Sequence, residues 1–511
     1  MRPAVFLAAL LLLVAGCTAP PDQDVRVDDP PAEAGLVHAL QGAIEPAEFT
    51  VPTFLLRGAV AAGGPLYGAG EPGIWAAMDG SLYVSFPGCD DGPYYFVSVP
   101  NSETCGHGLI WKSTDLGETW TRLNRHPDGL LTEDGPPANG DADVTADSAG
   151  NVYASNLGGG GIQFHRSQDG GATWQYMANL VPPTADPEDD PDTHEGADRQ
   201  WFAGAGPGHV INAWMRTSPK RDVEVNTTFD GGLNWTGNLT FGDGIGWVGP
   251  VQFAPDGTHA YIPYTQPTSN GFEMHVVGTA DGGRNWTDVA TGMTWSTPLA
   301  GSQWSGGHMA PALDVTGDGT VVVAMAIDVW ATPDGIAGPS AQGTAIVVRT
   351  SSDDGKTWGE TSTLRANAPA LAGMAGLSTT RIFPWVTGGA GDRFAITYFT
   401  NPLPVDNNQA GGVWSLEAVV CDGASTGALD CLTAVIDPNV HEGPICTQGG
   451  GCTGPGDRAL LDYFESDVTP DGRLVVVYPA DPVQSNKAIE IRVAVQDGGS
   501  FLLQRPTTEQ E

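Results

Sequence analysis

A set of charged and polar residues stands at the starts of predicted strands, where an apolar residue would otherwise serve. Two of its neighbourhoods resemble each other: His194-Glu195-Gly196 precedes Asp198-Arg199, and His441-Glu442-Gly443 precedes Asp457-Arg458. Because such residues can bind or transform a ligand, we take the whole set as candidate site residues. Its members are Asp141, Asp143, Asp198, Arg199, His308, Arg381, Asp457, Arg458, Asp462, Tyr463 and Glu465.

The three arginines of this set have a definite chemistry. A planar guanidinium matches a carboxylate through two parallel hydrogen bonds. Arg199, Arg381 and Arg458 would therefore bind an acidic ligand if they converged. The chain contains only 22 Lys and Arg against 60 Asp and Glu. Structural ion pairs with acidic neighbours are the alternative, and both interpretations stay open.

Two acidic segments raise the question of a bound cation. The run from Asp186 to Glu195 offers many carboxylate oxygens, which calcium prefers, although a solvated loop would have the same composition. The segment from Asp314 to Gly319 is similar to the start of a calcium loop, but Met325 stands where the distal Glu would be. No Walker loop, zinc-protease or serine-hydrolase motif appears. We therefore predict no firm metal site or cofactor, with calcium left open.

A short phrase that occurs five times fixes where these residues fall in the fold. Each copy reads approximately Ser/Thr-x-Asp-x-Gly-x-Thr/Asn-Trp, most clearly in Arg166–Trp174. The Asp can accept bonds from backbone groups that follow it, Gly tolerates positive φ, and Trp buries a large ring. The phrase therefore predicts a structural hairpin turn. Its expected turn residues are Asp115, Trp120, Asp169, Trp174, Asp230, Trp235, Asp281, Trp286, Asp354 and Trp358.

The same strand pattern precedes every phrase. A strand, a Gly/Asp turn and a second strand lead to a third strand that runs into the phrase. Two further units, beginning near Ile382 and Ser466, have the strands without the phrase. A repeat of about 50 to 70 residues suits a four-stranded propeller blade. We predict an all-β fold, a β-propeller of four-stranded antiparallel blades, with seven blades favoured and six as the alternative. Residues 49–60 are expected to close the ring by pairing with the last blade.

The five phrases resemble the Asp-box, or BNR, repeat of sialidases and related β-propellers. The resemblance implies that the boxes lie on the outer rim and that ligands bind at one end of the axial channel. It further implies that Arg199, Arg381 and Arg458 bind a sugar carboxylate. By the same resemblance Tyr463 is the nucleophile, Glu465 activates it and Asp143 is the acid/base. Asp198 and His308 are further candidates for ligand binding.

One motif of that family is displaced. The sialidase Phe/Tyr-Arg-Ile-Pro motif belongs before the first box, whereas Arg381-Ile382-Phe383-Pro384 follows the fifth box and contains one extra residue. This departure leaves open whether the propeller is catalytic.

The N-terminus has the pattern of an export signal. Arg2 precedes an apolar run from Ala4 to Ala15 that is too short to span a bilayer as a helix. Val14-Ala15-Gly16-Cys17 resembles a lipobox, with an ordinary cleaved signal peptide as the alternative. Residues 1–17 are therefore predicted to be a lipoprotein-type signal peptide, 18–35 a disordered Pro/Asp-rich tether, and 36–511 a single propeller. We expect an exported protein held on the outer face of a membrane by a lipidated Cys17.

Six further cysteines are even in number, which suggests disulfides in an exported chain. Proximity in the sequence favours three local pairs, although six cysteines allow fifteen pairings. The favoured pairs are Cys89–Cys105, Cys421–Cys431 and Cys446–Cys452.

The net charge and the predicted fold class limit the kinds of binding partner that we expect. The formal net charge is −38 and no basic patch is visible, which argues against nucleic acid. We expect a monomer whose ligand outside the cytoplasm is a glycan or a protein. Because propellers host many functions, three possibilities stay open: carbohydrate recognition at the channel mouth, an exo-sialidase type of glycoside hydrolase, and a non-catalytic protein-binding or envelope-assembly scaffold.

Overall fold

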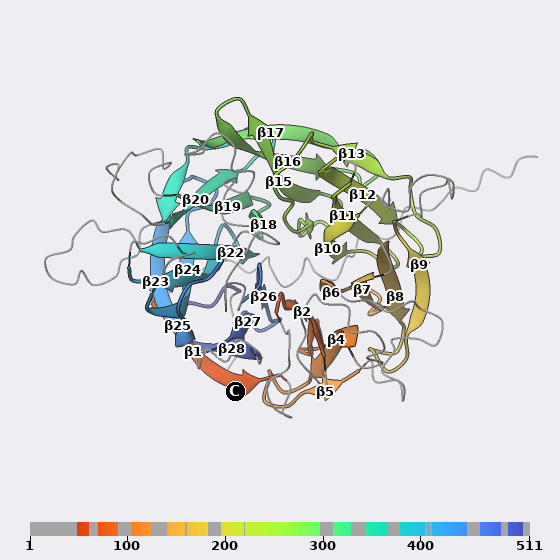
Figure 1. Cartoon of the computed structure of the whole chain (residues 1–511), viewed down its shortest axis with the longest axis horizontal. Coiled ribbons are helices and arrows are strands. Elements are labelled where there is room, and N and C mark those ends of the chain that lie inside the picture. The colour runs from red at the N-terminus through yellow and green to blue at the C-terminus, as the bar shows by residue number, and fades with distance from the viewer. Residues whose placement is uncertain are drawn as a thin grey trace, which may run out of the picture. The chain divides into compact units, whose positions relative to one another are not determined.

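A computed structural model describes the chain over residues 49–60, 70–89, 105–123, 140–158, 161–181, 196–218, 220–296, 310–328, 344–364, 379–403, 407, 411–446, 460–481 and 489–503. Within the compact unit from Ala34 to Glu511, the described residues form seven four-stranded sheets arranged as a ring (Figure 1). Every strand pair in these sheets is antiparallel. The prediction of a seven-bladed all-β propeller is confirmed.

The blades follow one another along the chain, each running from an inner first strand to an outer fourth strand. The first two blades comprise β2 (Gly73–Ala76), β3 (Leu82–Cys89), β4 (Cys105–Ser113) and β5 (Thr121–Arg122), then β6 (Ala142–Ala146), β7 (Val152–Gly158), β8 (Gly161–Ser167) and β9 (Gln175–Asn179). The next two comprise β10 (Ala197–Gly204), β11 (Val210–Arg216), β12 (Asp222–Thr228) and β13 (Leu239–Phe241), then β14 (Gln252–Phe253), β15 (Ala260–Thr268), β16 (Gly271–Thr279) and β17 (Thr287–Ser296).

The remaining blades complete the ring. The fifth and sixth comprise β18 (Ala312–Val315), β19 (Val321–Asp328), β20 (Thr344–Ser351) and β21 (Ser362–Leu364), then β22 (Thr380–Gly388), β23 (Phe394–Asn401), β24 (Val413–Asp422) and β25 (Asp430–Glu442). The seventh combines β26 (Glu465–Val468), β27 (Leu474–Ala480) and β28 (Glu490–Gly498) with the N-terminal β1 (Thr53–Ala59). Because β1 pairs with β28, the two ends of the ring share one sheet, as predicted.

The core lies between the blades, so the inner strands are apolar on both faces. In β19, residues Val321 to Ile327 are all buried, because one face of the strand packs against the fourth blade and the other against the sixth. One cluster joins Val322 and Ile346 of the fifth blade to Phe394 and Ile396 of the sixth. This continuous packing holds the first strands at fixed positions around the axis.

The five repeated turns join the third and fourth strands of the first five blades. In the second blade, Ser167 Oγ donates to Asp169 Oδ1 at 2.8 Å, and Thr173 donates from its amide and its hydroxyl to the same carboxylate. The closing tryptophans pack against the cores between blades. These contacts tie each outer hairpin together, far along the blade from the axis (Figure 1).

The fifth turn corrects one predicted residue. Asp353, and not Asp354, accepts from Ser351 Oγ and from Thr357. The carboxylate must stand two residues after the hydroxyl and five before the tryptophan, and Asp353 satisfies both spacings relative to Ser351 and Trp358. Asp354 instead has φ 61 and pairs with the exposed Lys356.

The cysteine predictions have mixed outcomes. The Cys421–Cys431 disulfide is confirmed across β24 and β25, and Cys446 is disulfide-bonded. Cys89 and Cys105 are register partners, but their side chains, like Cys17 and Cys452, lie outside the described part of the chain. Among the described residues, no helix is long and apolar enough to cross a membrane.

Candidate functional site

Aspartates on three of the first strands each bind one blade to the next. Asp143, Asp314 and Asp467 each precede a Val-Thr pair, and each carboxylate accepts the amide of its own Val at 2.7 Å. The second oxygen accepts an amide of the neighbouring first strand, also at 2.7 Å. Those amides belong to Phe202, Gly388 and Ala76. These aspartates therefore staple blade to blade.

Glu465 takes part in the same scheme. Its Oε2 accepts the Ile74 amide at 2.9 Å. A Cβ on Gly73 would lie 3.3 Å from Glu465 Oε2 and 3.3 Å from Asp143 Oδ1, so the two carboxyl groups crowd around one glycine. Burial raises the pKa of Asp143 to about 7. Burial and then the charge of Asp143 raise the pKa of Glu465 well above its ordinary range.

A second group of charged residues gathers where the first strands begin. We call it the mouth cluster; it consists of Glu71, Asp141, Asp198, Arg199, Asp462 and Tyr463. The Arg199 guanidinium forms an ion pair with Asp462. Its central carbon lies 5.3 Å from the ring centroid of Tyr463 and 5.1 Å from that of Trp247. The Tyr463 ring in turn meets the Trp201 ring edge-on, with centroids 4.7 Å apart.

The backbone is strained around this cluster. Glu71, Arg199, Phe383 and Leu461 have φ of 47°, 57°, 54° and 55°, although none is glycine. Each stands at the start of a first strand, and the pairing of β10 with β11 is irregular between Asp198 and Trp201. A non-glycine residue in this region costs about 1–3 kcal/mol, and such residues collect at functional sites.

Burial and neighbouring charges raise the pKa values of several groups in the cluster. Burial, then the charges of Asp141 and Asp462, raise the pKa of Glu71 well above its ordinary range. Burial, then Asp141, raise the pKa of Asp198 to about 6. Burial likewise raises the pKa of the Tyr463 phenol well above its usual value. Burial therefore favours the protonated forms of Glu71 and Tyr463.

Several buried polar atoms here have no partner among the described residues. They are Nε and Nη1 of Arg199, Oδ2 of Asp141, Oε1 of Gln200 and Nε1 of Trp201. Arg199 and Trp201 are each only 2% exposed. Because buried polar atoms are nearly always hydrogen-bonded, this mixture of donors and acceptors indicates a place for a polar, hydroxyl-rich ligand or for water.

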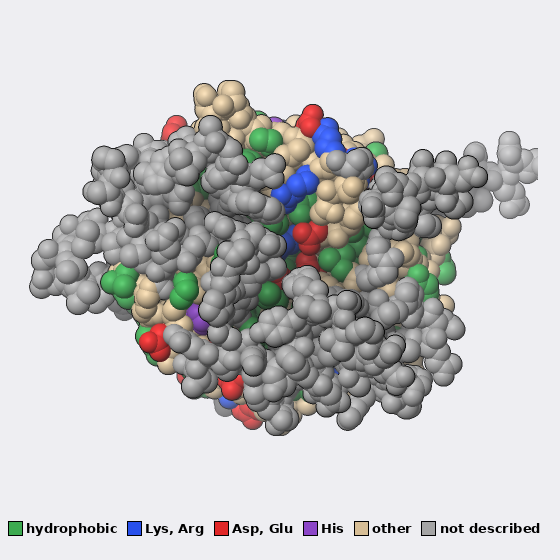
Figure 2. Space-filling view, in the orientation of Figure 1, with side chains coloured by type: hydrophobic (Ala, Val, Ile, Leu, Met, Phe, Trp, Pro, Cys, Tyr) green, Lys and Arg blue, Asp and Glu red, His purple; other side chains and the backbone are tan. Residues whose placement is uncertain are grey.

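The loop between β11 and β12 adds a second arginine. The Arg221 guanidinium lies 4.8 Å from the Trp247 ring centroid and interacts electrostatically with Asp198. In the space-filling view, basic, acidic and hydrophobic side chains stand together in the hollow near the centre of the ring (Figure 2).

The structure brings most of the predicted site residues together. Tyr463 interacts electrostatically with both Arg199 and Glu465. Glu465 lies close to Asp143, and Asp198 lies close to Arg199. Arg381 is elsewhere: its Nη1 donates to Leu364 O at 2.7 Å and its guanidinium faces Tyr398, between the fifth and sixth blades. Arg199 and Arg381 therefore do not come together as the predicted three-arginine cluster requires. Arg458 and His308 lie outside the described residues.

The reason for the displacement of Arg381 lies in the strand start. Both β10 and β22 are irregular, between Asp198 and Trp201 and between Ile382 and Trp385. Aligned on these irregularities, Phe383 occupies the position of Arg199, and Arg381 comes two residues too early.

Glu71 and Arg221 were not predicted. Glu71 precedes the first strand of the first blade, so it satisfies the criterion that selected the other candidates. Arg221 could be recognised only once its hairpin loop was known to face the mouth. No group of three His, Cys, Asp or Glu side chains in the described ranges is arranged to hold a metal ion, and residues 186–195 fall outside those ranges.

No family model and no curated protein matches the chain. Among solved structures, it is similar to an α-L-arabinofuranosidase from Fusarium graminearum, at 14% identity and TM-score 0.39 over 76% of this chain and 97% of that one. It is also similar to an intramolecular trans-sialidase from Ruminococcus gnavus, at 13% identity and TM-score 0.42 over 88% of this chain and 98% of that one. A sialidase from Streptococcus pneumoniae is similar at 11% identity and TM-score 0.41, over 89% of this chain and 70% of that one. Likenesses this distant concern the fold only.

Proposed function

We propose that the mouth cluster holds one residue of a glycan and cleaves its glycosidic bond, with Glu71 as the proton donor. The observation that carries this proposal is the placement of the buried Glu71 carboxyl beside Asp141, whose Oδ2 has no partner among the described residues. Burial and then the charge of Asp141 raise the pKa of Glu71. Glycoside hydrolysis uses a protonated carboxyl and a second carboxylate, and Glu71 and Asp141 supply two neighbouring carboxyl groups at the mouth.

The other predicted catalytic residues suit different roles. Asp143 gives both oxygens to backbone amides, so it cannot carry the proton to a substrate without breaking a blade-to-blade contact. The Tyr463 phenol holds its proton, which favours a role as wall and hydrogen-bond donor over one as nucleophile. The acid therefore moves from Asp143, the sequence candidate, to Glu71.

Charge balance favours a neutral sugar. Among the described residues, the cations near the four carboxyl groups of the mouth cluster are Arg199 and Arg221, and Arg199 is already paired with Asp462. A sugar carboxylate would be repelled by the remaining acids. The unpartnered donors of Arg199 and the acceptors of Asp141 and Gln200 instead fit neutral hydroxyl groups.

The test is a panel of neutral and sialylated aryl glycosides and oligosaccharides. We expect hydrolysis of a neutral glycoside, reduced about 10²- to 10⁴-fold by Glu71→Gln, with Glu118→Gln on the exposed rim as matched control. Turnover of sialosides alone, or full activity in Glu71→Gln, would contradict the proposal. Glycan binding without turnover would leave recognition as the function.

We further propose, from the sequence of residues 1–17, that the chain is exported and lipid-anchored through Cys17. Its glycan would then be met outside the cytoplasm. Metabolic labelling with a fatty acid should mark the wild type and leave Cys17→Ser unlabelled. Equal labelling of both would exclude this anchor.

A further inference from the structure

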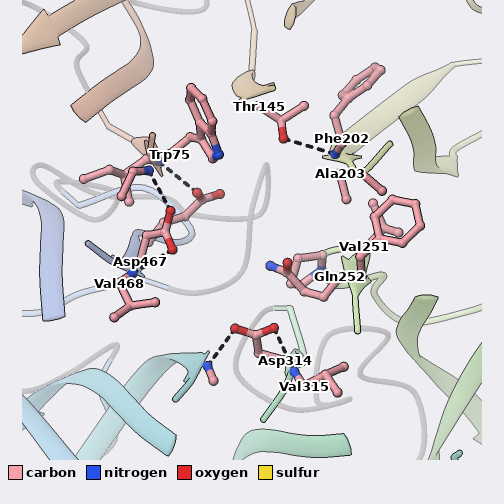
Figure 3. Close-up of a pocket in the computed structure, with 18 of the residues that line it drawn as sticks. Trp75, Thr145, Phe202, Ala203, Val251, Gln252, Asp314, Val315, Asp467 and Val468 are labelled. Atoms are coloured by element: carbon pink, nitrogen blue, oxygen red, sulfur yellow. Dashed lines mark hydrogen bonds between the residues drawn. The ribbon is translucent and has the colours of Figure 1, made fainter. Parts of the chain in front are cut away.

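A cavity of about 280 Å³ lies along the axis at the other ends of the first strands. We call it the channel cavity and define it by Trp75, Gln252, Phe253, Asp314, Trp385 and Asp467. Trp75, Gln252, Asp314 and Asp467 are labelled in Figure 3. Its wall continues through the turns that follow the first strands, such as Ala205-Gly206 and Gly388-Gly389. The mouth cluster stands at the opposite ends of the same strands, so the two places are distinct.

The channel cavity is acidic and has no basic lining residue. Its titratable lining residues are Asp143, Asp314, Glu465 and Asp467, with no Lys, Arg or His among the described residues that line it. Asp314 and Asp467 are close enough for the charge of one to act on the other. Their amide partners leave each carboxylate with further lone pairs, and neither forms an ion pair within the described ranges. The cavity therefore attracts positive charge.

Aromatic rings make up much of the remaining wall. Trp75 and Phe253 are partly exposed, and Trp201, Phe202 and Trp385 are buried around them. Ring faces attract cations, most strongly where the cation is desolvated. Trp201 also brings an indole N–H that is buried and has no described partner, so a ligand hydroxyl would find a donor there.

We propose that the channel cavity binds a small organic cation, an alkylammonium that carries a hydroxyl group. The acids and rings would hold the ammonium, and the Trp201 indole N–H would donate to the hydroxyl. A cavity near the small end of the range of about 300–1,000 Å³ for ligand sites suits such a molecule. A bare metal ion is a poorer occupant, because no metal-holding group of side chains occurs among the described residues.

Binding should be linked to proton release. Burial raises the pKa of Asp314 to about 7 and that of Asp467 to about 6. A bound cation favours the ionised carboxylates and so lowers both pKa values. Affinity should therefore increase as the pH rises through about 6 to 7 and should be weakest in mild acid.

The experiment uses choline and its neutral isostere 3,3-dimethylbutan-1-ol as calorimetric probes on the full chain. We expect choline to bind about tenfold or more tightly than the isostere, and more tightly at about pH 8 than at about pH 5. Equal binding of the two probes, or no heat from choline at millimolar concentration, would overturn the proposal.

Two Gln→Lys variants locate the site. Gln252→Lys places an ammonium inside the cavity, where it should stabilise the fold and abolish choline binding. Gln168→Lys, on an exposed turn, should leave choline binding unchanged. Undiminished choline binding by folded Gln252→Lys protein would overturn the assignment of the cavity. Glu71→Gln should bind choline normally, which separates this proposal from the proposed hydrolase.

Discussion

At the scale of single residues, the same side-chain type serves two purposes along the axis. Asp143, Asp314 and Asp467 are occupied with backbone amides, whereas Asp141 keeps an oxygen without a described partner. The sequence alone placed all of these residues at or near first strands. It did not indicate which of them would accept a backbone amide. That difference depends on how neighbouring strands are offset, which no single segment encodes.

Removing a staple should be costly. Asp143→Ala would leave the amides of Val144 and Phe202 without their acceptor, at about 1–3 kcal/mol for each buried group. We expect a clear loss of unfolding free energy in urea denaturation. Glu118→Ala, which removes only the exposed pair with Arg57, should change stability by less than about 1 kcal/mol. Equal effects of the two variants would contradict the structural role of Asp143.

At the scale of elements, the turns were the most predictable part of the chain. Five repeated phrases located the hairpins, and the strand pattern located the blades. The fifth turn was misread by one residue because Asp353 and Asp354 are adjacent and only the hydrogen bonds distinguish them. The strand starts were less predictable, since the irregular pairing near Arg199 and Phe383 shifts which side chain reaches the mouth.

Adjacent substitutions test the fifth turn. Asp353→Asn should lower the melting temperature, because the amide cannot reproduce all the bonds from Ser351 and Thr357. Asp354→Asn should leave it nearly unchanged, since Asn tolerates the positive φ and only the exposed Lys356 contact is lost. The opposite order of melting temperatures would restore Asp354 as the turn residue.

At the scale of the whole molecule, closure of the ring by β1 unites residues near both ends of the described chain. This explains how seven units form one closed domain, in which each blade keeps only a short outer edge strand. The seven-bladed ring was predictable from repeats alone. The acidic interior was not, because burial of a carboxyl depends on what the other six blades place around it.

The acidic interior makes stability depend on pH in an unusual direction. The pKa values of Asp143, Asp314, Asp467 and Asp198 are raised from 3.8 to about 7, 7, 6 and 6. Their contribution is present below about pH 4 and is lost as pH rises through 6 to 7. Hydrogen bonds from Thr119 and Thr173 lower the pKa of Asp115 and Asp169 to about 2. The contribution of these two carboxylates to stability is therefore lost only as the pH falls toward strong acid.

Thermal melts across the pH range should therefore show a maximum in mild acid, at about pH 4–5, and a decline toward about pH 8. A melting temperature that rose steadily from mild acid to neutral pH would show that the buried carboxyls are ionised at little cost.

The most direct test of the central claim compares leaving groups on one neutral glycoside. If Glu71 donates the proton, Glu71→Gln should lower kcat/KM by about 10²-fold or more for a poor leaving group such as methanol. The same variant should lose little on a 2,4-dinitrophenyl glycoside, whose leaving group needs no proton. An equal loss on both substrates, or no loss on either, would contradict the role of Glu71 at the mouth of the propeller.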